Sequence, residues 1–168
     1  MSKQKLLDFF RKNKLRIIYT TSGSEMPDYS DIIPHLREAK KLGGKTKGNR
    51  AHEILDELKP LPGECVVNKL TQEAFSSSNI DSVLRAMGVK HILFTGVSTT
   101  NCVEGTFRGA VDHGYRCLAV EDGCGDWTQE EHGGGVMRFR RMGRAETTDN
   151  VVKELYDALR KETTPQSK

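Results

Sequence analysis

Apolar runs alternate with amphipathic stretches along this chain. Nearly continuous apolar segments at 16–21, 64–69, 91–96, 116–122 and 145–148 predict strands. Apolar residues at helical spacing predict helices at 3–13, 51–58, 79–88, 99–114, 128–142 and 149–161, with the fifth interrupted by three consecutive glycines, Gly133, Gly134 and Gly135. Apolar strands that alternate with helices indicate a parallel sheet covered on both faces. The pattern therefore predicts an α/β fold, a three-layer α/β/α sandwich with a mainly parallel sheet.

The segment between the first two predicted strands breaks this pattern. Residues 22–50 are rich in Gly, Pro, Ser, Asp and Lys, so we expect a long irregular excursion. Loops of this length inside a compact domain often have a function. The polar segment 162–168 predicts a flexible tail. The length of 168 residues fits a single domain over 1–168.

Composition and charge exclude some classes of protein. The chain is 36% hydrophobic and 29% charged with a net charge of +3, which is too weak for a dedicated nucleic-acid binder. Two basic stretches are interpreted as solvated faces or an anion-facing rim, namely Lys40, Lys41, Lys45, Lys47 and Arg50, and Arg138, Arg140, Arg141 and Arg144. No run approaches the ~20 apolar residues of a membrane span, and the N-terminus has no signal-peptide core. We therefore expect a cytoplasmic protein that binds neither membrane nor nucleic acid.

The cysteines do not form a metal or disulfide pattern. The four cysteines contain no CxxC pair, which predicts reduced thiols and no structural zinc. His35 follows the first strand without nearby metal-ligand partners, and His52 lies far along the chain, so no catalytic metal is expected. We expect no cofactor. His132 is interpreted as structural.

The carboxyl ends of parallel strands are where function gathers in such sheets. That rule directs attention to Thr20–Thr21, Lys69, the segment 96–102 and Asp122. A polar turn after the strand at 91–96 places Cys102 in the first turns of a helix, where unpaired backbone N–H groups favour an anion. A thiol there can have a pKa well below about 8.5, and the same N–H groups can hold an oxyanion. A buried structural cysteine is the alternative, and the spacing alone leaves both interpretations open.

The stretch GVSTTNCVEGTFRGAVDHGYRCLAVED resembles the signature of the isochorismatase-like cysteine hydrolases, the superfamily of nicotinamidase and N-carbamoylsarcosine amidohydrolase. The segment VVNKLTQEAFSSSNIDSVLRAMGVKHI is similar to the family's segment with a catalytic lysine, and EDGCGDWTQEEH and AETTDNVVKEL also resemble the family. The similarity covers residues 15–160.

The resemblance implies a role for several residues. Cys102 corresponds to the nucleophile and Lys69 to the lysine of an Asp-Lys-Cys triad, whose ammonium would favour the thiolate. The Val97–Ser98 bond corresponds to a cis peptide, and the N–H groups of Ser98 and Cys102 to the oxyanion hole. The substrate pocket would include Phe75, Thr99 and Asn101. The family also implies a homo-oligomer.

One part of the family pattern is absent from the sequence. The family begins with an apolar strand that ends in the catalytic Asp, whereas this chain begins within the following helix, a residual segment at 1–14. The expected result is a gap in the sheet between the strands at 16–21 and 91–96. A truncated chain, a strand donated by another copy and a sheet closed around the gap are three explanations. Asp8 is a poor substitute for the Asp, and Asp28 and Asp31 are loop acids that are expected to be solvated.

The resemblance predicts a hydrolase of a C–N bond in a small amide, ureido or carbamoyl compound, acting through a thioester on Cys102. One hypothesis is that basic residues of the 37–50 segment attract a substrate that bears a carboxylate. The alternative is a catalytically impaired or inactive member of the family that serves as a scaffold or binding module. A third possibility is hydrolysis of the ether bond of isochorismate. A nucleophilic cysteine makes this reaction less favoured.

Overall fold

The structure is a computed structural model that describes residues 2–163. Its strands are β1 (Ile18–Ser22), β2 (Cys65–Lys69), β3 (His91–Val97), β4 (Arg116–Gly125) and β5 (Arg144–Glu146). Its α-helices are α1 (Ser2–Lys12), α2 (Pro34–Leu42), α3 (Ile80–Ala86), α4 (Glu104–Asp112), α5 (Gln129–Met142) and α6 (Thr148–Thr163). Three short turns complete the chain, namely two 3-10 turns, η1 (Arg50–His52) and η2 (Asp56–Leu58), and the π turn η3 (Thr99–Val103).

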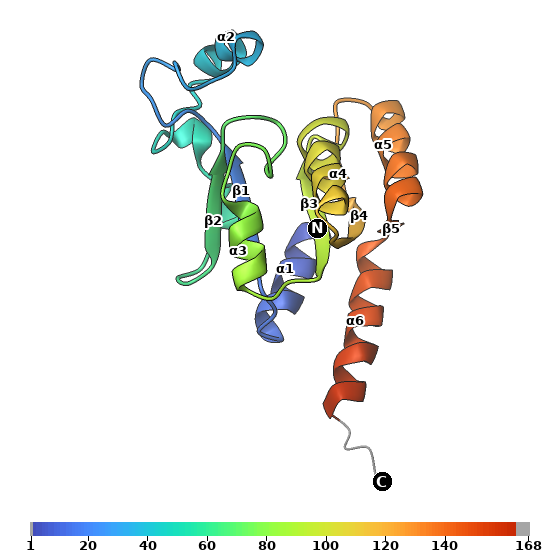
Figure 1. Ribbon diagram of the computed structural model, residues 1–168. Helices are drawn as coiled ribbons and strands as arrows, with labels where there is room; N and C mark the ends of the chain where they lie inside the picture. Colours follow the sequence, from blue (N-terminus) through green and yellow to red (C-terminus); the bar gives the residue numbers. More distant parts are fainter. Residues whose placement is uncertain (1, 164–168) are drawn as a thin grey trace.

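All strand pairs of the described chain are parallel, as predicted. They form two separate sheets, one of β1 and β2 and one ordered β3-β4-β5 (Figure 1). The break therefore lies between β1 and β3, where the sequence predicted a gap. In the first sheet Ser22, the last residue of β1, lies opposite Lys69, the last residue of β2.

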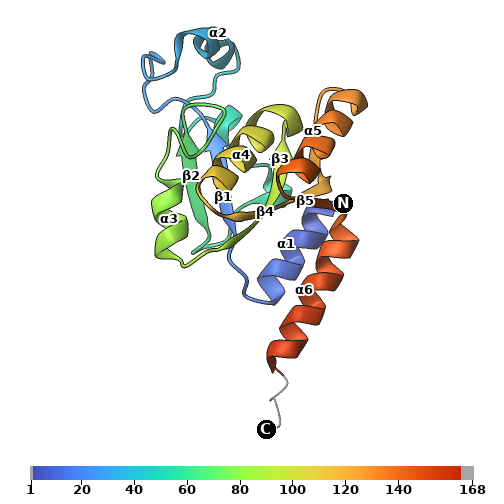
Figure 2. The ribbon, with the colours of Figure 1, turned by 45° about the vertical axis from the view of Figure 1, so that its right-hand side comes forward.

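Strand β4 shows how the layers are built. Its residues Cys117 and Ala119 belong to the larger core cluster, which includes Phe107 of α4 and Phe139 of α5. The intervening Leu118 and Val120 face a smaller cluster formed with α1 and α6. Alternate residues of a strand point to opposite faces of its sheet. Helices α4 and α5 therefore cover one face, and α1 and α6 cover the other (Figure 2), which confirms the predicted three layers.

Two predicted segments differ in the structure. Residues 51–58 form the turns η1 and η2 and not an α-helix, because no residue of either turn is buried and no packed apolar face supports a longer helix. The excursion 22–50 is not wholly irregular, since α2 lies within it. Pro34 stands at the start of α2, a position where its fixed φ favours a helix.

Two further helices also differ from the prediction. The segment 99–114 begins as the π turn η3 before it continues as α4. Helix α5 runs through its three glycines without a break, because a capping box of Thr128 and Glu131 starts the helix and its buried residues pack on the core. Helix α6 extends two residues into the tail predicted at 162–168, and the rest of that tail lies outside the described residues.

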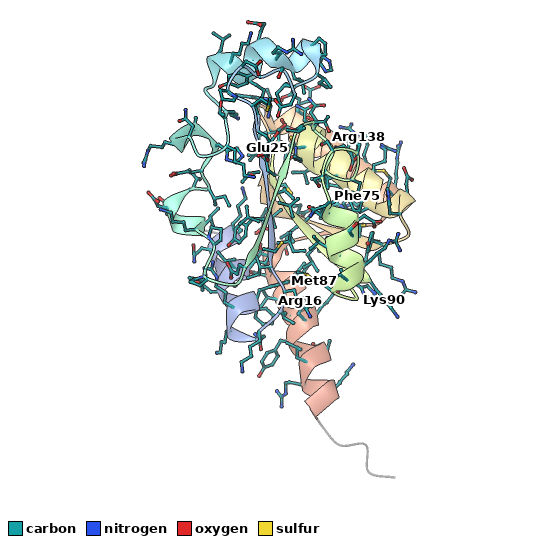
Figure 3. All side chains as sticks on the ribbon, turned by 60° about the vertical axis from the view of Figure 1, so that its left-hand side comes forward. Arg16, Glu25, Phe75, Met87, Lys90 and Arg138 are labelled. Atoms are coloured by element: carbon teal, nitrogen blue, oxygen red, sulfur yellow. The ribbon has the colours of Figure 1, made fainter. Side chains whose placement is uncertain are left out.

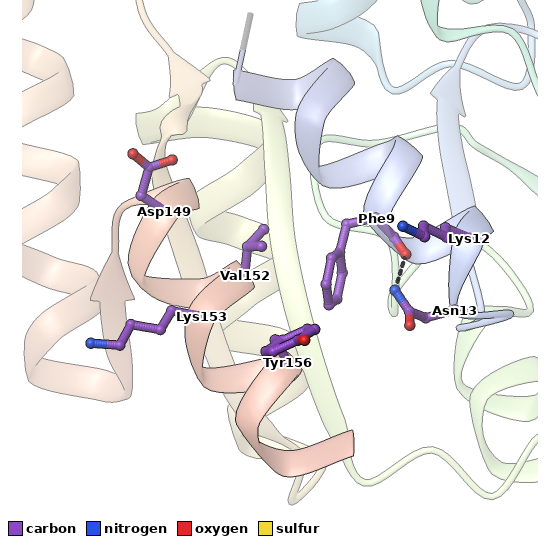
Figure 4. A pocket seen from close by; sticks show the side chains of 7 residues that line it. All are labelled: Phe9, Lys12, Asn13, Asp149, Val152, Lys153 and Tyr156. Carbon is purple, nitrogen blue, oxygen red and sulfur yellow. Dashed lines mark hydrogen bonds between the residues drawn. The ribbon is translucent and has the colours of Figure 1, made fainter. Parts of the chain in front are cut away.

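A hollow lies between α1 and α6, away from the carboxyl ends of the strands. It is lined by Phe9, Lys12, Asn13, Asp149, Val152, Lys153 and Tyr156 (Figure 4). None of these residues belongs to the predicted site. Among the helices that the structure describes, none is long and apolar enough to cross a membrane.

Candidate active site

Cys102 and Lys69 meet at the carboxyl ends of their strands. Lys69 is the last residue of β2, and Cys102 lies in the turn that follows β3. The Nζ atom of Lys69 donates a hydrogen bond to the Sγ atom of Cys102 across 3.3 Å. Two side chains that are 33 residues apart in sequence are thus brought into contact at this edge of the fold.

The ammonium group of Lys69 is buried and fully hydrogen-bonded. The residue is 3% exposed, and its Nζ donates to the carbonyl oxygens of Thr71 and Gln72, each at 2.8 Å, in addition to the sulfur. These acceptors use all three N–H bonds of an ammonium. No ion pair of the described residues involves Lys69. Since buried charges require compensation, the sulfur of Cys102 is the one ionisable group in direct contact that can supply it.

Cys102 lies on a turn of unusual shape. The Val97–Ser98 peptide bond is cis, the geometry that the family resemblance implied. The carbonyl oxygen of Ser98 then accepts hydrogen bonds from the N–H groups of Asn101 at 3.3 Å and Val103 at 3.2 Å. Cys102 itself is half-buried.

Two of the other thiols have raised pKa values. All four cysteines are free, and Cys117 is buried. Burial raises the pKa of Cys117 to about 12. Burial also raises the pKa of Cys124 to about 11, against the opposing effect of a backbone hydrogen bond. These two cysteines fit the structural role that the sequence left open for Cys102.

Asp126 holds the Cys102 turn from the end of β4. One carboxylate oxygen accepts hydrogen bonds from both the N–H and the hydroxyl of Thr100, each at 2.7 Å. Burial acts to raise the pKa of Asp126, but the hydrogen bonds from Thr100 and Trp127 outweigh it and keep the pKa below its ordinary value. Asp126 was not predicted from the sequence, because the predicted strand ended at 122 whereas β4 continues to Gly125.

Thr99 joins the same turn to helix α5. It is 0% exposed, and its hydroxyl is hydrogen-bonded to Nδ1 of His132 in α5 at 2.9 Å. The assignment of Thr99 to the substrate pocket stays a prediction, and in the structure its side chain is fully buried. The same hydrogen bond agrees with the interpretation of His132 as structural.

Glu104 fixes the start of α4. Its two carboxylate oxygens accept from Nε of Arg138 in α5, each at 2.8 Å, and Arg108 contacts the same carboxylate at 3.4 Å. Arg138 had been interpreted as part of a solvated or anion-facing stretch, whereas its partner is a carboxylate of this protein. The Cys102 turn is thus joined to α5 on both sides of the cysteine.

The remaining residues predicted for the site are Phe75, Asn101 and Val97. Phe75, labelled in Figure 3, stacks on the ring of His113 with centroids 4.7 Å apart and lies 5.9 Å from the ring of Tyr115. These contacts place Phe75 beside the core cluster. Asn101 is exposed, and Val97 is 67% exposed at the end of β3. The roles of Phe75 and Asn101 in a substrate pocket stay predictions.

The loop carboxylates have other partners. Asp31 accepts from the hydroxyl of Ser24 and, at 2.8 Å, from the N–H of Glu25, and Asp28 accepts from the N–H of Ser30 at 3.0 Å. Asp122 accepts from the N–H and hydroxyl of Thr148 at 2.7 and 2.9 Å and so caps α6. In the described part of the chain no carboxylate is hydrogen-bonded to Cys102 or Lys69.

The two histidines near the excursion do not gather with other ligands. His52 contacts the side-chain oxygen of Asn68 at 2.9 Å. Within residues 2–163 no group of three or more His, Cys, Asp or Glu side chains could hold a metal ion.

Lys40 is a further side chain at this edge of the fold. It belongs to α2, and its Nζ donates to the carbonyl oxygen of Ser22 at 3.0 Å and to the hydroxyl of Ser22 at 2.5 Å. Because Ser22 is paired with Lys69, the two ammonium groups lie at the ends of adjacent strands. From the sequence, Lys40 was recognisable only as one member of a basic stretch.

The sequence matches a known family over most of its length. The model of the isochorismatase domain matches residues 3–150. The chain is 32% identical over 160 residues to the ureidoacrylate amidohydrolase RutB of Variovorax paradoxus, covering 92% of this chain and 62% of that protein. It is 38% identical over 131 residues to RutB of Caulobacter segnis, covering 70% of this chain and 55% of that protein. The chain thus spans less than two thirds of these relatives.

Solved structures share the fold. The N-carbamoylsarcosine amidase of Thermoplasma acidophilum superposes with a TM-score of 0.73 and 25% identity, covering 88% of this chain and 81% of that one. A cysteine hydrolase of Pseudomonas syringae pv. phaseolicola has a TM-score of 0.85 and 23% identity, covering 94% and 79%. At 23% identity the second likeness concerns the fold alone.

Proposed function

This chain belongs to the isochorismatase family, and on that premise we propose that it hydrolyses a C–N bond in a small amide, ureido or carbamoyl compound with Cys102 as nucleophile. The observation that carries the proposal is the 3.3 Å contact between the sulfur of Cys102 and the buried ammonium of Lys69. An ammonium at this distance stabilises a thiolate, which is the nucleophilic form of cysteine.

The reaction would proceed in two steps. The thiolate attacks the carbonyl carbon, and the negative charge passes to the carbonyl oxygen, for which the N–H groups of Ser98 and Cys102 are the proposed donors. Collapse of this intermediate breaks the C–N bond, and the amine leaves with a proton taken from water. The hydroxide left by that proton transfer then attacks the thioester carbonyl and the C–S bond breaks, which releases the acid and restores the thiolate. Lys69 compensates the charge on sulfur at the start and end of the cycle.

Named relatives support the class of substrate. RutB is named as an amidohydrolase of ureidoacrylate, and the Thermoplasma structure as an amidase of N-carbamoylsarcosine. Both names describe hydrolysis at a C–N bond next to a carbonyl group. Cleavage of an amide, ureido or carbamoyl group by this chain is our inference from these names and from the geometry at Cys102.

A panel of small primary amides, ureido acids and carbamoyl compounds tests the proposal, with released ammonia as the measurement. We expect ammonia from at least one class of compound and its loss in Cys102→Ala. Cys65→Ala, which changes a half-buried thiol that lies in β2, should retain the activity. Undiminished release from Cys102→Ala would overturn the role of the cysteine.

A second candidate is a binding module that has the fold without turnover. It is favoured by the lack of a carboxylate bonded to Cys102 or Lys69 in the described chain, because a general base typically contributes about 10²–10⁴-fold to the rate. Failure of the whole panel with folded protein, combined with saturable binding of one of the compounds, would establish this candidate and overturn the first.

A further inference from the structure

The lysines on this side of Cys102 have no carboxylate partner among the described residues. Burial and the positive charges of Lys69 and Lys45 lower the pKa of Lys40, and Cys102 acts in the opposite direction. None of the three lysines takes part in an ion pair of the described residues. With Cys102 ionised the cluster still carries a net positive charge.

Three acidic residues of the segment around α2 have other partners. Glu25 accepts from Lys47 and from the side chain of Asn68, and Asp31 accepts from Ser24 and the backbone of Glu25. Glu38, on the same helix, is paired with Lys41. None of these carboxylates therefore pairs with Lys40, and its positive charge is available to an anion that binds from solution.

Lys40 is held in place by its surroundings. Two of its three N–H bonds go to the carbonyl and hydroxyl oxygens of Ser22. The chain after α2 is tied back to the end of β1, because the N–H of Ser24 donates to the carbonyl of Lys45 at 2.9 Å and the N–H of Lys47 donates to the carbonyl of Ser24 at 2.8 Å. The third N–H bond of Lys40 has no partner among the described residues and is available to a ligand.

We propose that Lys40 is a specificity-determining residue that binds the carboxylate of the substrate while Lys69 serves the sulfur. The proposal rests on the proposed function of Cys102 and deepens it. The substrate class is then a small ureido, carbamoyl or amide compound that also bears a carboxylate. A carboxylate at Lys40 completes the charge balance of the cluster, and a neutral amide of the same shape leaves it incomplete.

The state of Lys40 supports this assignment. Burial, together with the positive charges of Lys69 and Lys45, lowers the pKa of Lys40 to about 8 against the opposing effect of Cys102. A bound carboxylate would favour the charged form of the lysine. An ammonium that is partly desolvated and already directed by Ser22 also loses little on binding an anion.

The first test requires no turnover. Iodoacetate and iodoacetamide alkylate the same thiolate but differ in charge, so the ratio of their rates at Cys102 reports an anion site beside the sulfur. Peptide mapping by mass spectrometry restricts the measurement to Cys102. We expect the iodoacetate-to-iodoacetamide ratio to fall by about fivefold or more in Lys40→Met, in keeping with a hydrogen bond to a charged group.

Three variants complete this test. Lys40→Gln, which keeps an N–H donor without the charge, should lower the ratio as Lys40→Met does, and Lys40→Arg should preserve it. Lys41→Met changes the neighbouring exposed lysine, whose partner is Glu38, and should leave the ratio unchanged. An unchanged ratio in folded Lys40→Met and Lys40→Gln, or an equal fall in Lys41→Met, would overturn the proposal.

The second test uses turnover of a ureido acid and of its neutral methyl amide. In Lys40→Met we expect KM for the acid to rise about tenfold or more with kcat within about threefold, and KM for the amide to stay unchanged. An equal effect on both compounds would contradict a carboxylate site at Lys40. If neither compound is hydrolysed by the wild-type protein, the proposed function fails, and the alkylation ratio still decides the role of Lys40.

Discussion

Helix α5 touches the Cys102 turn at a point where only glycine fits. A Cβ atom added to Gly135 would lie 2.6 Å from Cγ2 of Thr99. At Gly133, two residues earlier in the same helix, an added Cβ would meet no atom within 4 Å. The packing of α5 against the Cys102 turn thus requires a glycine at Gly135 but not at Gly133.

This contrast predicts opposite effects for two alanine substitutions. Gly135→Ala should destabilise the fold by about 1–3 kcal/mol, because the methyl group forces α5 away from the turn. Gly133→Ala should leave stability unchanged or raise it by up to about 1 kcal/mol, because alanine favours a helix. Urea denaturation measures both. Equal stability of the two variants would contradict the close approach of α5 to Thr99.

Loss of the Asp126 carboxylate should loosen the turn that carries Cys102. In Asp126→Asn the oxygen that accepts from the N–H and hydroxyl of Thr100 loses its charge, and we expect a loss of about 1–2 kcal/mol in the free energy of unfolding. The alkylation rate of Cys102 should also fall, since its position depends on the turn. Glu130→Gln, an exposed change in the first turn of α5, is the control and should alter neither quantity.

Alkylation near neutral pH should leave Cys117 and Cys124 largely unmodified. With pKa values of about 12 for Cys117 and about 11 for Cys124, fewer than about one in a thousand of these thiols is ionised at pH 7.5. Their labelling should therefore be negligible in folded protein, and mass spectrometry with iodoacetamide measures it. Rapid labelling of Cys117 would show that the core opens readily.

Removal of the Lys69 charge should slow the reaction of Cys102. Lys69→Met keeps the length of the side chain but removes the ammonium that contacts the sulfur, and we expect the iodoacetamide rate at pH 7.5 to fall by about tenfold or more. Lys90→Met, at an exposed lysine labelled in Figure 3, is the matched control. A rate in Lys69→Met equal to that of the control would show that the ammonium does not stabilise the thiolate.

The ion pair of Arg11 and Glu64 should make part of the stability depend on acid pH. Their side chains are 20% and 14% exposed, and Nε of Arg11 lies 2.8 Å from Glu64. The hydrogen bond from Arg11 lowers the pKa of Glu64 from 4.5 to about 2. Because the folded pKa is the lower one, the contribution is present above about pH 4.5 and is lost as the pH falls towards 2.

Glu64→Gln checks this expectation by thermal unfolding as a function of pH. The wild type should exceed the variant in stability at pH 6, and the difference should shrink as the pH falls from 4.5 towards 2. Glu57→Gln, an exposed change in η2, should reproduce the wild-type profile. A difference that stays constant over this range would show that Arg11 does not favour the ionised form of Glu64.

The strands and the position of Cys102 could be predicted from the local sequence pattern. Five apolar runs became five parallel strands, and Cys102 follows one of them at its carboxyl end. These features depend on side-chain periodicity and on the rule that parallel strands end together, both of which a sequence displays directly. The prediction failed where packing is absent, as at 51–58, and where a single proline starts a helix, as at Pro34.

Contacts between distant segments were decided by the tertiary structure alone. The partners Thr100 and Asp126, Thr99 and Gly135, and Ser22 and Lys40 are separated by many residues, and no periodicity relates them. Sequence by itself determined which strands exist and that a cysteine and a lysine stand at their ends. Only the folded chain decided that Lys69 is buried against the sulfur of Cys102 and that Lys40 reaches Ser22 at the end of the adjacent strand, because contacts between segments distant in sequence depend on how the whole chain packs.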